Sequence, residues 1–230
     1  HLCRLVLFFR GRGGSFEKRV KQFWKQNKTL IKGGLQFLAI ALVVFVIAIP
    51  FMRVDNPGNT YGIDVSSHNG TVRWDEVSEN GVQFAVIRAG VRTSRTGEIY
   101  RDTQFKRNMR RAWFHHVDRG VYFYSQAVQP EEAAEEAQWC LDFLAGENLQ
   151  LPLVYDWEYV GPAARTGGMD KATLTECAKT FCQTIESGGY QPMLYFNSHQ
   201  ARTLMYLYEL EDYPFWLAYY NNRMNFPHRF

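Results

Sequence analysis

From residue 61 onward, short runs rich in β-branched and aromatic residues alternate with longer stretches of helical periodicity. This alternation predicts a parallel sheet with helical crossovers, because parallel neighbours cannot be joined by a tight turn. The predicted strands are 61–65, 83–89, 120–125, 152–157, 193–197 and 215–220. The predicted helices are 74–80, 102–117, 130–144, 171–187 and 199–208. The fold class is therefore α/β, with six predicted strands where a regular closed barrel has eight.

Two carboxylates stand one residue apart at the end of the fourth predicted strand, where residues 153–158 read LVYDWE. Side chains alternate between the two faces of a strand, so Asp156 and Glu158 are expected on one face, about 6.5–7 Å apart along the backbone. When two carboxyl groups lie this close, the pKa of one of them rises. Such a pair suits general acid catalysis, above all the cleavage of a glycosidic bond.

Other polar and aromatic side chains fall at the ends of the remaining strands, where functional residues gather in parallel α/β folds. Asp64 ends the first predicted strand and is expected to face the same mouth as the carboxylate pair. Candidate substrate-binding residues at equivalent places are Arg88, Tyr122, Tyr124, Tyr195, Asn197, Trp216 and Tyr220. Aromatic rings with polar tips suit sugar rings. The structural alternatives are a helix N-cap for the Asp and core or rim packing for the aromatic residues.

The histidines and cysteines do not predict a metal site. His115 and His116 fall at the exposed end of a predicted helix with no third ligand in view, and no C-x-x-C pair occurs. His68 follows Asp64 closely enough to line the mouth, although a loop hydrogen bond explains it equally well. The cysteines are predicted to be buried or free thiols rather than disulfides: Cys3, Cys140, Cys177 and Cys182. An acidic run is predicted to form a solvated helix face: Glu131, Glu132, Glu135 and Glu136.

Charge divides the chain unevenly. Residues 1–34 hold nine Lys or Arg residues and one acidic residue, which gives a formal charge of +8. Residues 53–230 hold 17 Lys or Arg residues and 22 Asp or Glu residues, which gives a formal charge of −5. We therefore expect no nucleic-acid binding by the main domain. Residues 35–52 are 18 uncharged and mainly apolar residues, just enough to cross a bilayer. The positive-inside rule then predicts a cytoplasmic basic tail (1–34), a transmembrane helix (35–52), a linker (53–60) and an extracellular domain (61–230). A cleaved signal peptide is the alternative, although its apolar stretch is usually shorter.

Several segments of the predicted domain, taken in order, resemble glycoside hydrolase family 25, the Chalaropsis-type lysozymes or N-acetylmuramidases. The segments are YGIDVSSHNG (61–70), VRW (72–74), GVQFAVIRAG (81–90), GVYFYS (120–125), YDWE (155–158), MLYFN (193–197) and WLAYY (216–220), together with Asp102, Phe105 and Asn108. The resemblance covers roughly residues 60–221 and implies an irregular, flattened β/α barrel.

The resemblance also implies an activity, which is hydrolysis of the β-1,4 bond between N-acetylmuramic acid and N-acetylglucosamine in peptidoglycan. By position, Glu158 would be the general acid, and Asp64 would complete the acidic floor of the groove. Asp156 would raise the pKa of Glu158 and either assist the substrate's 2-acetamido group or act as the nucleophile. The expected partners are peptidoglycan glycan strands and, through residues 35–52, a membrane, so that a monomer acts at the bacterial cell surface.

One departure from the family pattern concerns the end of the domain. Family members usually carry a further Asp near the last strand, after a Trp-Gln-Tyr segment, and neither is present in this chain. The domain 61–230 is therefore expected to be C-terminally incomplete, and a barrel without its last strand would expose an unpaired edge. Two functional alternatives are a non-catalytic wall-glycan-binding or scaffold protein on the same fold, and hydrolysis of another N-acetylated glycan such as chitin.

Overall fold

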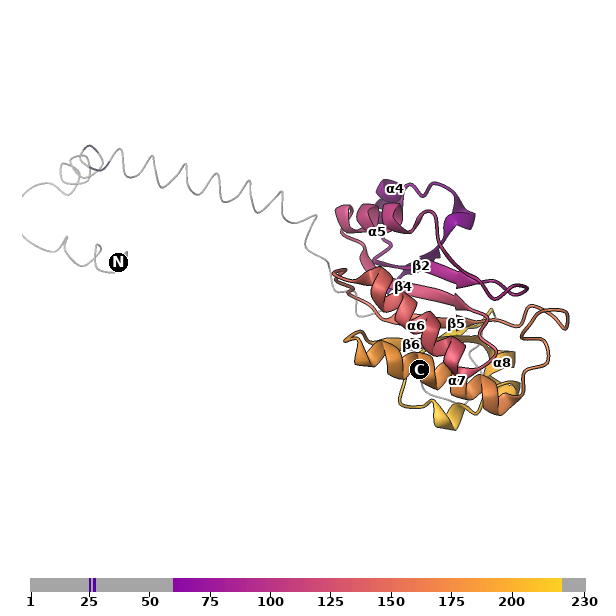
Figure 1. Cartoon of the computed structure of the whole chain (residues 1–230). Helices are drawn as coiled ribbons and strands as arrows, with labels where there is room; N and C mark the ends of the chain where they lie inside the picture. Colours follow the sequence, from indigo (N-terminus) through magenta and orange to yellow (C-terminus); the bar gives the residue numbers. More distant parts are fainter. Residues whose placement is uncertain (1–24, 26, 28–59, 221–230) are drawn as a thin grey trace, which may run out of the picture. The chain divides into compact units, whose positions relative to one another are not determined.

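The computed structural model describes Lys25, Asn27 and residues 60–220 (Figure 1). The predicted basic tail, apart from those two residues, lies outside the described residues, as do the predicted transmembrane helix 35–52, the linker up to residue 59, and residues 221–230. Within the described part of the chain, no helix combines the length and apolar character that a membrane crossing needs.

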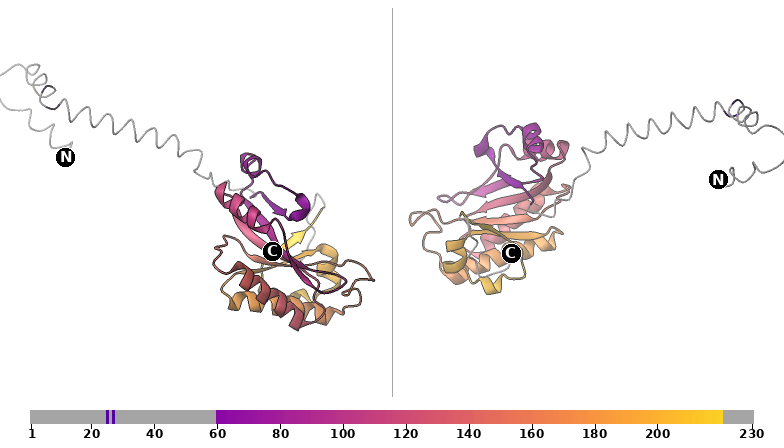
Figure 2. Two further views of the ribbon diagram at one scale, coloured as in Figure 1. Left: turned by 45° about the horizontal axis from the view of Figure 1, so that its top comes forward. Right: turned by 180° about the vertical axis from the view of Figure 1, so that it is seen from behind.

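Residues 60–220 contain one curled sheet with helices against one face (Figures 1 and 2). Its strands are β1 (Gly62–Val65), β2 (Phe84–Arg92), β3 (Ile99–Arg101), β4 (Asp118–Ser125), β5 (Leu153–Trp157), β6 (Pro192–Asn197) and β7 (Phe215–Ala218). The parallel strands follow the order β1-β2-β4-β5-β6-β7, and β3 pairs antiparallel with β2. Among the described strands, β1 and β7 each have a neighbour on one side only, so the sheet is a half-barrel.

All six predicted strands are present, and the prediction of a parallel α/β sheet is confirmed. Sequence reasoning missed β3, because three residues with two exposed side chains are too short to show a period of two. The predicted helix 199–208 is divided into α8 (Ser198–Thr203) and η3 (Leu207–Glu209). The backbone N–H of Tyr206 donates to Thr175 Oγ1 at 2.9 Å, a contact from another helix that periodicity does not reveal.

The remaining helical elements are η2 (Ser67–Asn69), α4 (Trp74–Glu79), α5 (Phe105–Phe114), α6 (Pro130–Leu144) and α7 (Lys171–Ser187). Local sequence features explain where two of these helices begin. Proline stands at the start of α6, where a missing N–H costs nothing, and Asp170 caps α7 by accepting the Thr173 N–H at 2.9 Å. Helices α6 and α7 lie side by side over β4, β5 and β6 (Figure 1), which leaves the other face of these strands open to a groove.

Strand alternation separates two apolar clusters. The larger one faces the helices and contains Ile87 of β2, Phe123 of β4 and Tyr155 of β5, each fully buried. The smaller one is formed on the opposite face by Val86, Tyr122 and Val154, with half-buried neighbours around it. The same three strands therefore supply both clusters. Odd positions build the helix-facing core and even positions build the floor under the groove.

An irregularity in β2 changes this alternation. The pairing of β2 with β4 shifts between Arg88 and Gly90, so Arg88 lies opposite Tyr122 and Val91 lies opposite Tyr124. One extra residue in a strand inverts the faces of everything beyond it. Val91 consequently lines the groove, and Arg92 turns to the helix-covered face, where its Nε donates to Glu136 Oε1 at 2.7 Å.

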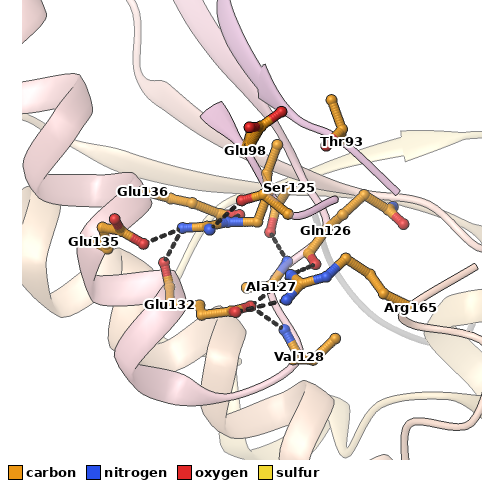
Figure 3. Close-up of polar contacts among 12 residues, drawn as sticks. Thr93, Glu98, Ser125, Gln126, Ala127, Val128, Glu132, Glu135, Glu136 and Arg165 are labelled. Atoms are coloured by element: carbon orange, nitrogen blue, oxygen red, sulfur yellow. Dashed lines mark hydrogen bonds and ion pairs between the residues drawn. The ribbon is translucent and has the colours of Figure 1, made fainter. Parts of the chain in front are cut away.

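The prediction that the acidic run of α6 is a solvated face is wrong for two of its members. Glu136 is fully buried and pairs with Arg92, and Glu132 forms a two-point ion pair with Arg165 (Figure 3). Burial raises the pKa of Glu136 to about 7, against the opposing effect of the Arg92 guanidinium. The prediction of free or buried thiols is confirmed for Cys140, Cys177 and Cys182, while Cys3 lies outside the described residues.

Candidate active site

A groove of about 970 Å³ lies on the face of the sheet opposite the helices. Nine of the ten candidate site residues line it: Asp64, Arg88, Tyr122, Tyr124, Asp156, Glu158, Tyr195, Trp216 and Tyr220. Both end strands of the half-barrel contribute, since Asp64 belongs to β1 and Trp216 to β7. His68 also lines the groove, in agreement with one of the two interpretations that the sequence allowed for this residue.

The centre of the groove is one row of side chains carried across four strands. In the sheet register, Tyr124 lies opposite Asp156, Asp156 opposite Tyr195, and Tyr195 opposite Trp216. Residues in register on neighbouring parallel strands point to the same face. Glu158 follows two positions after Asp156 and lines the same groove, so the prediction that this pair shares a face is confirmed.

Asp156 is the deeply buried member of the carboxylate pair, with 7 % of its surface exposed. Burial raises the pKa of Asp156 well above its usual value, the negative charges of Glu158 and Asp64 raise it further, and Arg88 opposes them. Asp156 lies inside the sheet, whereas Glu158 lies just beyond the end of β5. Asp156 Oδ1 has no hydrogen-bond partner among the described residues.

Glu158 is half-buried and lies directly after β5. The Tyr195 hydroxyl forms a hydrogen bond with its carboxylate, and burial, followed by the charges of Glu158 and Asp156, raises the pKa of Tyr195. Burial and the same two carboxylates raise the pKa of Tyr124 to about 12. Both hydroxyls therefore remain protonated near neutral pH and are available as hydrogen-bond donors.

Arg88 is held in place by protein groups rather than left free in the groove. Its Nε donates to Asp102 Oδ2 at 2.9 Å, and its Nη2 donates to Ser67 Oγ at 2.9 Å. Burial opposes ionisation of Asp102, but the backbone N–H groups of Ser67 and Gln104, together with Arg88, lower its pKa. Arg88 is the one Lys or Arg side chain among the described residues that line the groove, and its positive charge opposes the rise in the pKa of Asp156.

The far wall of the groove is aromatic. Tyr195 and Trp216 meet edge to face with ring centroids 4.9 Å apart, and Tyr220 lies at the rim with 92 % of its surface exposed. Apolar ring faces beside protonated hydroxyls fit a ligand with both C–H faces and hydroxyl groups. Among the described residues, no three His, Cys, Asp or Glu side chains gather closely enough to hold a metal ion.

Asn197 is the one predicted site residue that does not line the groove. Its side chain accepts the Gln200 N–H at 2.9 Å, and Gln200 Oε1 accepts the Asn197 N–H at 3.0 Å, which closes a capping box on α8. Asn197 therefore has a structural role at the start of α8, and its role as a substrate contact stays a prediction. A strand-end Asn followed three residues later by Gln is the sequence signal that indicates this structural role.

This assignment predicts the result of replacing Asn197. Asn197→Ala should lower the free energy of unfolding by about 1 kcal/mol, because the N-cap acceptor is lost. The Michaelis constant for a glycan substrate should stay near the wild-type value. Urea denaturation and steady-state kinetics on the same preparation check both parts. A large rise in the Michaelis constant without loss of stability would return Asn197 to the binding site.

A second prediction concerns Asp64, whose charge helps to raise the pKa of Asp156. Asp64→Asn removes that charge, so the ionised form of Asp156 becomes less unfavourable and the pKa of Asp156 should fall. Carboxyl carbon NMR over a pH series measures this directly, with Glu79→Gln at the exposed end of α4 as the control. A pKa of Asp156 that is unchanged or higher in Asp64→Asn would contradict the electrostatic coupling.

Comparison with known proteins agrees with this geometry. The profile of glycosyl hydrolases family 25 matches residues 63–227. Lysozyme M1 of Streptomyces globisporus is 30 % identical over 135 residues, which cover 54 % of this chain and 42 % of that protein. Among solved structures, the spore cortex lytic enzyme SleM of Clostridium perfringens has a TM-score of 0.63 at 21 % identity. The match covers 77 % of this chain and 59 % of the SleM chain.

The modular autolysin LytC of Streptococcus pneumoniae has a TM-score of 0.60 at 24 % identity. The match covers 70 % of this chain and 38 % of the LytC chain. This chain thus spans less than half the length of both Lysozyme M1 and LytC. The profile match over residues 63–227 includes the strands that carry the groove, apart from the first residue of β1. With its carboxylate pair, its curled parallel sheet and a profile match over residues 63–227, the chain belongs to glycosyl hydrolases family 25.

Proposed function

We propose that this protein is a peptidoglycan hydrolase that cleaves the β-1,4 bond between N-acetylmuramic acid and N-acetylglucosamine. The observation that carries the proposal is the position of Asp156 and Glu158 in one groove, beside a row of tyrosine hydroxyls and a tryptophan ring. Membership of glycosyl hydrolases family 25 supports the reaction type, and relatives bear names such as lysozyme and autolysin.

In this proposal, Glu158 is the general acid. It is half-buried and lies above the end of β5, where the oxygen of a bound glycosidic bond can reach it. The Tyr195 hydroxyl donates to its carboxylate and keeps it oriented. Protonation of the leaving oxygen by Glu158 removes negative charge from the departing sugar as the C–O bond breaks. A positioned acid of this kind commonly contributes about 10²–10⁴-fold to the rate.

Asp156 has the complementary role of holding the substrate's 2-acetamido group. Its Oδ1 is buried and lacks a partner among the described residues, and an unpaired buried acceptor costs about 1–3 kcal/mol. An acetamido N–H in the groove would satisfy this oxygen. Because the pKa of Asp156 is raised, its carboxylate is a strong acceptor for that proton while the acetamido oxygen attacks the anomeric carbon. This favours substrate assistance over direct attack by Asp156.

A glycan assay tests the reaction. The purified protein should clear a suspension of peptidoglycan and release new reducing ends at muramic acid. Saturable binding to the glycan without new reducing ends would support the non-catalytic alternative and refute the proposal. Release of reducing ends from chitin but none from peptidoglycan would move the activity to another N-acetylated glycan.

We further propose that residues 35–52 anchor the protein in a bacterial cell membrane with residues 61–230 outside. The support is the uncharged apolar stretch and the +8 charge of the 34 residues before it. Protease added to intact cells should degrade the domain of the full chain and leave a membrane-bound N-terminal fragment that resists an alkaline wash. A released domain with a new N-terminus within or just after 35–52 would instead indicate a cleaved signal peptide.

A further inference from the structure

Two buried glutamine side chains hold the backbone on either side of Glu158. Gln126 Nε2 donates to the Glu158 carbonyl at 2.9 Å, and Gln200 Nε2 donates to the Trp157 carbonyl at 3.2 Å. Gln126 is fully buried and Gln200 is 1 % exposed. They come from the segments that follow β4 and β6, which are the two strands that flank β5 in the sheet.

The sheet itself does not hold this point of the chain. The pairing of β5 with β4 ends at Trp157, and its pairing with β6 ends at Asp156. Glu158 therefore lies beyond the last residue that ladder hydrogen bonds fix. The two glutamine amides replace those missing bonds, one on each side of the Cα atom that carries the Glu158 side chain.

Gln126 is in turn fixed by groups that do not line the groove (Figure 3). Thr166 Oγ1 donates to Gln126 Oε1 at 2.9 Å, which sets the direction of the amide and aims Nε2 at Glu158. Arg165 Nη1 donates to the Gln126 backbone carbonyl at 2.9 Å, and both Arg165 amino groups bond Glu132 at 2.7 and 2.6 Å. The Gln126 backbone N–H lies beside the carboxylate of Glu136, which Arg92 holds.

We propose that Gln126, oriented by Thr166 and by the Arg165–Glu132 pair, is a positioning residue for Glu158, and that Gln200 supports the peptide unit on the other side of the Glu158 Cα atom. This inference rests on the proposed function for its kinetic consequence, but its structural consequence is independent of that function. A general acid works only when its proton points at the leaving oxygen, and a displacement of about 1 Å can cost on the order of 10²-fold in rate.

Thr166 offers a matched pair of variants, because it is 2 % exposed and does not line the groove. Thr166→Val keeps the shape of the side chain and removes the hydroxyl, so the Gln126 amide loses the donor that fixes its direction. Thr166→Ser keeps the hydroxyl and removes a methyl group. A positioning role predicts that the valine variant is impaired and the serine variant is near wild type, whereas a packing role predicts the reverse order.

For a soluble muramyl glycan oligosaccharide, Thr166→Val should lower kcat by roughly tenfold or more and change KM by less than about twofold. Thr166→Ser should keep kcat within about twofold of wild type. Gln138→Leu is the control, since Gln138 is an exposed residue of α6 whose side chain donates to Asp142. Equal loss in both Thr166 variants, or a rise in KM alone, would overturn the proposal.

Backbone amide exchange of a peptide spanning 153–160 gives a readout that needs no activity. It should be faster in Thr166→Val than in wild type and unchanged in Thr166→Ser. An unchanged amide exchange rate in the valine variant would contradict the positioning role even if the protein is an active hydrolase. If the wild-type protein releases no reducing ends, the proposed function is refuted. The exchange result then still tests whether Thr166 and Gln126 position the backbone at Glu158. Should Thr166→Val lose cooperative unfolding, Thr166→Ala carries the same test, because it differs from Thr166→Ser only in lacking the hydroxyl donor.

Discussion

Glu158→Gln is expected to lower the rate of glycan hydrolysis by about 10²–10⁴-fold, because a glutamine amide of nearly the same shape has no acidic proton to give. The loss should appear in kcat, while KM stays close to that of the wild-type protein. Release of reducing ends from peptidoglycan measures the rate. Glu79→Gln, an exposed residue at the end of α4, makes the same chemical change away from the groove and should leave the rate unchanged.

The fold of this variant should be preserved, since Glu158 is only half-buried and its backbone carbonyl, rather than its carboxylate, accepts the Gln126 amide. Thermal unfolding and circular dichroism check this point. A Glu158→Gln protein that hydrolyses peptidoglycan at the wild-type rate would remove Glu158 from the general acid role.

Asp156→Asn should lower kcat by about 10²–10³-fold, in the range seen when one group that stabilises a transition state is removed. The amide keeps the shape of the side chain, but it is a much weaker acceptor for the proton of the acetamido group. Asp212→Asn, at an exposed position, is the matched control. An Asp156→Asn protein with an unchanged kcat would contradict the role proposed for this carboxylate.

The same variant should affect stability with a definite pH dependence. The folded-state pKa of Asp156 is raised, so its stability contribution is fully present below the unfolded-state value near 3.8 and is lost as the pH rises through the folded-state pKa. Asparagine has no such titration. Asp156→Asn should therefore unfold at a higher temperature than wild type near neutral pH, and this difference should disappear below about pH 4. A stability difference that grows as the pH falls would contradict the burial of a costly charge.

Much of the site could be predicted from the sequence because strand alternation is a local property. Asp156 and Glu158 had to share a face once residues 153–157 formed a strand, and the strand ends placed Asp64, Tyr124, Tyr195 and Trp216 at one groove. Sequence reasoning missed Gln126, Gln200, Thr166 and the Arg165–Glu132 pair. Gln126 follows a predicted strand directly, and that position was the one signal that could have drawn attention to it.

Local periodicity by itself determined the parallel strands, the helices between them and the shared face of Asp156 and Glu158. Only the tertiary structure decided that β2 shifts its register after Arg88, which sends Arg92 to Glu136, and that Asn197 caps α8. It also decided that Asp156 lies deeply buried beside Glu158 and Asp64, which raises the pKa of Asp156. The physical reason is the distance along the sequence over which each property is determined. A side chain's face follows from its neighbours in sequence, whereas register, ion-pair partners and depth of burial depend on residues tens of positions away.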